Sequence, residues 1–272
     1  MKLSPRTTRP TPVPNWPPPR DQIAKGLASR RPHRVANHVA RRALAVALAG
    51  ATVSMAACDE FPTPAELAKP QILAIRADPP AIPAGGTAVL TILVADSNGQ
   101  VEAPDVTWQT SPTNPGEPAL GSVAMVDGGS VIYTAPPQTA EAITLASVTA
   151  RVKTDDSELV GVKVVTIADL TLGNPQIVAF TADGTDVLSA GSLTVKPGQI
   201  VELEAQLEPD SVGPDPAQTK FAWYSTAGTI ERYQSNPVEM VAADASLQGW
   251  LFCVVRNGTG GVVWQAIRVT VE

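Results

Sequence analysis

The chain has 272 residues, of which 44% are hydrophobic, so its length allows one large or two small domains with a buried core. Its charges are unevenly distributed: residues 1–57 contain ten of the 20 Lys and Arg residues, both histidines and one acid, whereas residues 58–272 carry 10 basic and 25 acidic side chains. An acidic body without histidine excludes Ser-His-Asp and Cys-His catalysis and His-based metal sites, and it argues against nucleic acid as a partner.

The first segment of the chain ends in an uncharged run that follows Arg41 and Arg42 and stops at Cys58. At about 15 residues the run is shorter than a transmembrane helix, which needs roughly 20, but it is typical of a signal-peptide core behind a positive segment. We therefore expect residues 1–57 to be a basic, Pro-rich leader that is removed.

The residues before the cysteine indicate the kind of signal. Met55, Ala56, Ala57 and Cys58 resemble the lipobox of bacterial lipoproteins. The resemblance implies that signal peptidase II recognises the first three and that Cys58 is diacylated and becomes the new N-terminus. The alternative is an ordinary secretory signal with a chance cysteine.

Two acyl chains on Cys58 would anchor the protein stably in a membrane, which one chain does not. We therefore expect a lipid-anchored protein of the cell envelope, in the outer membrane or at the cell surface rather than in the inner membrane. Residues 58–69 are polar and contain proline, which suits a tether between the lipid and the first domain.

The rest of the chain repeats itself. Pro70-Gln-Ile-Leu-Ala is echoed by Pro175-Gln-Ile-Val-Ala, and Val106-Thr-Trp108 is echoed by Phe221-Ala-Trp223. This repetition predicts two homologous domains, residues 70–168 and 175–272, joined by a linker of residues 169–174.

Each copy is expected to consist of strands. Between Ala146 and Lys153, apolar residues alternate with polar ones, and turn residues at 154–157 precede a Val-rich run from Glu158 to Ile167. A period of two with turns at this spacing is typical of a β-sandwich. The fold class predicted is all-β, with two tandem sandwiches.

Several short motifs carry a family resemblance. Trp108, then Gly121-Ser-Val, then Tyr133-Thr-Ala-Pro136 resemble the bacterial immunoglobulin-like (Ig-like) domains of surface proteins and lipoproteins. The second copy, around Trp223 and between Val254 and Trp264, is similar to the Ig-like or PKD-like domains of predicted lipoproteins from delta-proteobacteria. The resemblance implies a structural, adhesive or ligand-binding role, with an accessory subunit of an envelope complex or enzyme as the alternative.

The strand around Cys253 predicts an aromatic surface. With Cys253 placed as a buried hydrophobe, alternation turns Trp250 and Phe252 outward. The same parity turns Tyr224 and Trp264 outward. It also turns Gln265 inward, unless a bulge near Gly260-Gly261 changes the register. This outer face either binds an envelope protein or glycan, or packs against the first domain, or is covered by the second copy's longer loop, or reflects an error of parity.

Other candidate sites are weaker. Acidic turns such as those at Asp96, Asp155-Asp156 and Asp183–Asp186 offer oxygen atoms to calcium, but they match no calcium-loop pattern. Asn257-Gly-Thr259 fits a glycosylation sequon and reads first as a turn. With no phosphate loop and no nucleophile motif, we expect no enzymatic activity, no cofactor and no metal site.

Overall fold

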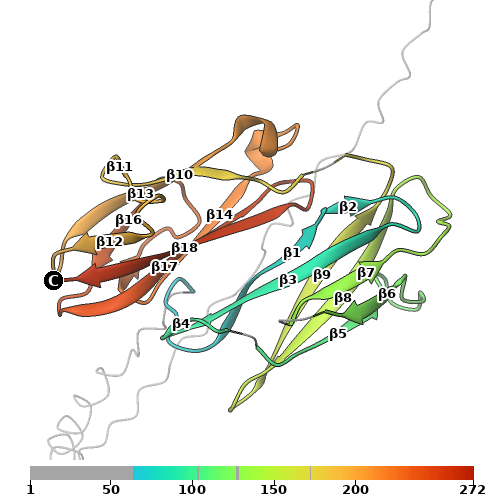
Figure 1. Cartoon of the computed structure of the whole chain (residues 1–272), viewed down its shortest axis with the longest axis horizontal. Coiled ribbons are helices and arrows are strands. Elements are labelled where there is room, and N and C mark those ends of the chain that lie inside the picture. The colour runs from blue at the N-terminus through green and yellow to red at the C-terminus, as the bar shows by residue number, and fades with distance from the viewer. Residues whose placement is uncertain (1–63, 103, 127–128, 172) are drawn as a thin grey trace, which may run out of the picture. The chain divides into compact units, whose positions relative to one another are not determined.

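The computed structural model describes residues 64–102, 104–126, 129–171 and 173–272. The described residues form two β-sandwiches of two sheets each, coloured from blue to green-yellow and from yellow to red in Figure 1. The all-β expectation of two tandem β-sandwiches is confirmed. Residues 60–272 belong to one compact unit.

The first sandwich contains strands β1 to β9. One sheet has the order β1 (Gln71–Asp78), β3 (Thr87–Asp96), β7 (Val131–Thr134) and β6 (Ser122–Met125), with β4 (Gly99–Gln100) also paired to β3. The other has the order β2 (Ala81–Ile82), β9 (Glu158–Ile167), β8 (Thr144–Lys153) and β5 (Val106–Ser111).

The second sandwich contains strands β10 to β18. One sheet has the order β11 (Thr185–Asp186), β10 (Ile177–Ala182), β13 (Ile200–Leu207), β16 (Val238–Ala242) and β15 (Gly228–Ile230). The other has the order β12 (Ser192–Val195), β18 (Val262–Val271), β17 (Leu247–Arg256) and β14 (Lys220–Ser225). Short 3-10 helices at Pro209–Ser211 and Pro216–Gln218 lie between β13 and β14.

The repeat in the sequence corresponds to a shared topology. In each copy a short early strand pairs in parallel with the last strand, β2 with β9 and β12 with β18. The tryptophans Trp108 and Trp223 are buried in equivalent strands, and each indole donates to a backbone carbonyl, that of Gly129 (3.0 Å) and that of Ser235 (2.9 Å). A buried indole N–H needs such a partner, and in both copies a backbone carbonyl supplies it.

Alternation places the cores as expected. Ala146, Val148, Ala150 and Val152 of β8 belong to the core of the first sandwich, and Cys253 lies in the core of the second with Trp223 and Phe180. The two aromatic rings of that core meet edge to face, with centroids 5.1 Å apart, an arrangement that aromatic pairs favour.

The inward position that parity gives Gln265 is confirmed, and no bulge changes it. The pairing of β17 with β18 runs from Arg256↔Val262 to Leu247↔Val271 without a register shift, so it contains no bulge that would turn Gln265 away. Gln265 lies opposite Cys253 on the core side of β18. It is only partly buried there and donates from Nε2 to the carbonyl of Ala266 at 3.1 Å.

Candidate functional site: the seam between the sandwiches

The four aromatic residues of the predicted surface lie on one face of one sheet. Tyr224 pairs directly with Phe252 in the register of β14 and β17, and Trp264 pairs with Val254 in that of β17 and β18. Trp250 stacks against Phe252 with ring centroids 6.1 Å apart and 22° between the planes. Parity therefore brought these residues together correctly.

That face is covered by the first sandwich. We call the covered region the seam and define it by one apolar cluster. Its buried members are Leu67, Leu73, Ala74, Leu93, Ala95, Ala222, Phe252, Val254 and Val262, and Tyr224, Trp250, Trp264 and Ala266 pack against them. Phe252 has 0% of its surface exposed. An open binding face is therefore the wrong interpretation, and packing against the first domain, the alternative that the sequence left open, is what the structure has.

Trp250 occupies the edge of the seam. The guanidinium carbon of Arg268 lies 4.5 Å from the Trp250 ring centroid, a cation–π contact. Gly99 also approaches the ring, so closely that an added Cβ would lie 2.2 Å from Trp250 Nε1. The hairpin between β3 and β4 thus fits onto the indole only because residue 99 has no side chain.

The end of the expected tether belongs to the seam as well. Ala65 is buried in the core of the second sandwich, and Leu67 is buried in the seam. The N–H of Ser225 in β14 donates to the carbonyl of Ala65 (3.0 Å), and the N–H of Leu67 donates to that of Ser225 (3.4 Å). Within the expected tether of residues 58–69, residues 65–67 therefore dock against the edge of β14, with Ala65 and Leu67 as the buried side chains.

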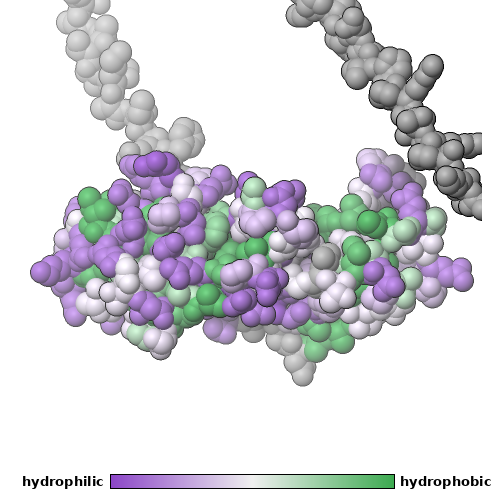
Figure 2. All heavy atoms as spheres, turned by 90° about the horizontal axis from the view of Figure 1, so that it is seen from above, coloured by the Kyte–Doolittle hydropathy of each residue, from purple (hydrophilic) through white to green (hydrophobic). Residues whose placement is uncertain are grey.

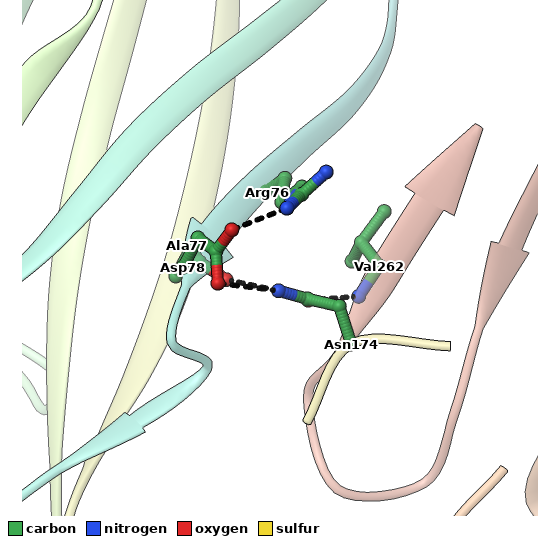
Figure 3. A network of polar contacts seen from close by, with 5 residues as sticks. All are labelled: Arg76, Ala77, Asp78, Asn174 and Val262. Carbon is green, nitrogen blue, oxygen red and sulfur yellow. Dashed lines mark hydrogen bonds and ion pairs between the residues drawn. The ribbon is translucent and has the colours of Figure 1, made fainter. Parts of the chain in front are cut away.

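The linker is also tied to both sandwiches, as Figure 3 shows. Asn174 Nδ2 donates to the carbonyl of Ala77 at 2.9 Å and to Asp78 Oδ1 at 3.4 Å, while its Oδ1 accepts from the N–H of Val262 at 2.8 Å. Arg76 pairs with the same Asp78 carboxylate. One amide side chain therefore bridges the end of β1 and the start of β18.

Asn257 has a similar role in the turn between β17 and β18. Its Nδ2 donates to the carbonyls of Gly173 (3.3 Å) and Ser211 (3.4 Å), and its Oδ1 accepts from the N–H of Gly261 (2.7 Å). The side chain is buried. The sequon Asn257-Gly-Thr259 is therefore a turn, and its amide is used to hold the turn and the linker.

A groove of about 410 Å³ opens along the seam between β1, β9 and the turn that joins β17 to β18. Lys163 from β9 and Arg256 from β17 both line it. Lys163 is 6% exposed, and its Nζ donates to the carbonyl of Gly260 at 2.5 Å. Burial, with the nearby Arg256 charge as a second cause, lowers the pKa of Lys163 to about 8.

Neither cation was singled out from the sequence. A signal for Lys163 was present, because it shares the parity of Val165 and Ile167, which are buried in the core of the first sandwich, and alternation therefore points it inward. Arg256 carried no such signal. Its Nη2 donates to the carbonyl of Leu73 at 2.5 Å, a partner 183 residues away.

The remaining predicted sites are placed as follows. Cys58, Met55, Ala56 and Ala57 lie outside the described residues. Burial raises the pKa of the Cys253 thiol. The portion of the chain that the structure describes has no helix long and apolar enough to cross a membrane. Within the same residues, no group of three or more His, Cys, Asp and Glu side chains could hold a metal ion.

Three of the aspartates in the acidic turns accept hydrogen bonds from nearby backbone N–H groups. Asp96 Oδ1 accepts from the N–H of Asn98 (2.7 Å), and Asp183 Oδ1 accepts from the N–H of Glu202 (2.9 Å). Asp186 Oδ1 accepts from the N–H groups of Phe180 (3.2 Å) and Leu188 (3.0 Å). These carboxylates stabilise turns, as Asx side chains commonly do.

Comparison with known proteins returns likenesses of fold. The chain matches no protein-family model and no curated protein. Among solved structures it is similar to the titin Ig tandem A164-A165, at 14% identity over 75% of this chain and 96% of that one, with a TM-score of 0.24. It is also similar to the Yersinia pseudotuberculosis adhesin InvE, at 17% identity over 73% of this chain and 58% of the adhesin, with a TM-score of 0.24.

A third likeness is to fibronectin(III)-like modules of Clostridium thermocellum CbhA, at 10% identity over 75% of this chain and 94% of that one, with a TM-score of 0.27. At such identities and TM-scores none of these likenesses bears on what the chain does.

Proposed function

We propose that the protein is a non-catalytic lipoprotein of the bacterial cell envelope, anchored through acyl chains on Cys58, in which two Ig-like sandwiches act as one rigid body. The observation that carries the proposal is the docking of Ala65 and Leu67 into the second sandwich and the seam. A packed segment that begins a few residues after the lipidated cysteine gives the anchor a firm attachment to the body.

The connection to the membrane is short in this proposal. Seven residue steps separate Cys58 from Ala65, and at the maximum extension of the chain they span about 25 Å. The β14 edge of the second sandwich is then held near the lipid surface, and both sandwiches follow it because the seam joins them. A role in structure or adhesion close to the membrane suits this arrangement better than a long flexible stalk does.

The accessory role through the aromatic face loses its support, because that face is the seam. The surface left for partners is mixed in character: on the face drawn in Figure 2, hydrophobic patches lie between hydrophilic ones. The four aromatic residues are therefore not part of the surface that we propose for ligand binding.

The test is intact-mass analysis of the protein extracted from membranes, beside a Cys58→Ser variant. We expect the mature chain to begin at a diacylated Cys58 and the variant to lose both the added mass and the membrane fraction. Separating inner from outer membranes in the same preparation locates the protein. A soluble product that still contains an unmodified Cys58 would contradict the proposal.

A further inference from the structure

The groove along the seam gathers positive charge in a protein whose body is acidic. Residues 58–272 contain 10 basic side chains against 25 acidic ones, yet Lys163 and Arg256 share one groove. Two cations brought together in a partly dehydrated site repel one another, so their position needs a compensating interaction.

No carboxylate supplies it. The residues that line the groove come from Ile72–Ile75, Val160–Val164, Arg256-Asn257 and Gly260–Val262, and none of them is acidic. In the described portion of the chain the ion pairs join Arg76 with Asp78 and Arg151 with Glu158. Buried charges in proteins are normally paired with an opposite charge.

The donors of the two side chains are only partly used. An ammonium has three N–H donors and a guanidinium has five. In the contacts among the described residues, Lys163 Nζ donates to the carbonyl of Gly260, Arg256 Nη2 donates to that of Leu73, and the guanidinium of Arg256 also lies beside the phenol of Tyr224. These contacts fix both heads in the groove and leave further N–H groups free for an acceptor.

We propose that the groove is a binding site for an oxyanion, a phosphate or carboxylate group held jointly by Lys163 and Arg256. Lys163 supplies a compact charge, and Arg256 supplies a planar fork suited to two oxygens. The apolar walls formed by Ile72, Ile75 and Val162 lower the local dielectric and so strengthen both interactions. The proposal depends on the seam and is independent of any lipid on Cys58.

The first test uses the detergent-solubilised full chain at pH 7, with inorganic phosphate as the probe and sodium chloride at matched ionic strength as the reference. We expect phosphate to raise the Tm of the wild type with the logarithm of its concentration, by about 5 °C once the concentration exceeds the Kd about 20-fold, because a ligand that binds only the folded state stabilises it. Acetate in a parallel titration shows whether a carboxylate is accepted equally well. A wild-type Tm that follows ionic strength alone with both anions overturns the proposal.

Variants then assign the effect to the groove. We expect Lys163→Met to lose the phosphate-dependent rise, and Lys153→Met, at an exposed position of β8 in the same sandwich, to keep it. Arg256→Gln removes the second cation, gives the same expected loss, and serves in place of Lys163→Met if that variant does not fold. An equal rise in the groove variants and in Lys153→Met would place the anion elsewhere and overturn the proposal.

Discussion

Only glycine fits at position 99, because the backbone there lies against the Trp250 ring. Its φ is +112°, and an added Cβ would lie 2.2 Å from the indole nitrogen. Gly116 also has a positive φ, +88°, but an added Cβ would have no neighbour within 4 Å. An alanine at either position would therefore strain the backbone, but only an alanine at position 99 would also clash with a neighbouring side chain.

We expect Gly99→Ala to lower the free energy of unfolding by about 1–3 kcal/mol more than Gly116→Ala does, because both pay the strain and only the first overpacks the seam. Urea denaturation of the two variants beside the wild type measures the difference. Equal losses would mean that the hairpin between β3 and β4 moves freely away from the indole.

Because of Lys163, the free energy of unfolding should rise as the pH rises from about 8 to about 10.4. Its pKa is about 8 in the folded protein and about 10.4 in an unfolded chain. Between these values the unfolded state holds a proton that the folded state has lost, so this contribution to the free energy of unfolding rises with pH. The destabilisation caused by burying the charged Lys163 ammonium is complete below about pH 8 and absent above about pH 10.4.

In a buffer without phosphate or carboxylate we therefore expect Lys163→Met to be more stable than the wild type at pH 7, by at most about 3 kcal/mol. The advantage should disappear by about pH 10.5. Arg256, the charged neighbour in the groove, and the phenol of Tyr133, whose pKa burial raises to about 12, are present in both proteins and cancel. Urea denaturation at pH 7, 9 and 10.5 tests this, and an advantage that does not change with pH would refute it.

At the scale of elements, the segment before β1 docks against the edge of the second sandwich through one isolated β-bridge, between Glu66 and Ser225. Ala65 is buried in that sandwich, whereas Ala68, three residues on, is exposed. We expect Ala65→Asp to lower the free energy of unfolding by several kcal/mol, since it buries an unpaired carboxylate, and Ala68→Asp to change it by less than about 0.5 kcal/mol.

Hydrogen exchange gives a local measurement of the same contact. The amide of Ser225 donates to the carbonyl of Ala65, and the amide of Leu67 donates to that of Ser225. Both should therefore be protected in the wild type and in Ala68→Asp, and both should exchange faster in Ala65→Asp. Rapid exchange of the Leu67 amide in the wild type would show that the segment is not docked.

At the scale of the whole molecule, the seam should make the two sandwiches unfold together. The apolar cluster of the seam and the Asn174 bridge beside it join the two sandwiches, and both are lost if either sandwich unfolds alone. We expect a single calorimetric transition whose van't Hoff and calorimetric enthalpies agree.

Phe252→Ala tests this coupling. The side chain is fully buried in the seam, so its truncation should cost about 3–5 kcal/mol and separate the transition into two. Met125→Ala, at a residue that is 62% exposed on β6, is the matched control and should keep one transition. Two transitions in the wild type would show that the sandwiches are independent.

Much of this fold could be predicted because its signals are local. A period of two assigned the inward and outward residues of β8 and β17, and the repeated Trp identified the equivalent strands in the two copies. Parity also grouped Tyr224, Trp250, Phe252 and Trp264 correctly. It failed to say what covers them, because alternation defines the two sides of a strand and carries no information about the next layer.

The sequence by itself therefore determined the strand pattern, the two copies and the composition of each core, which depend on neighbours along the chain. Only the tertiary structure decided that the aromatic face is a seam, that residues 64–67 join β14, and that Lys163 and Arg256 share a groove. These features depend on contacts such as that between Arg256 and Leu73, 183 residues apart. Such pairings are set by how whole sheets pack, and no local period encodes them.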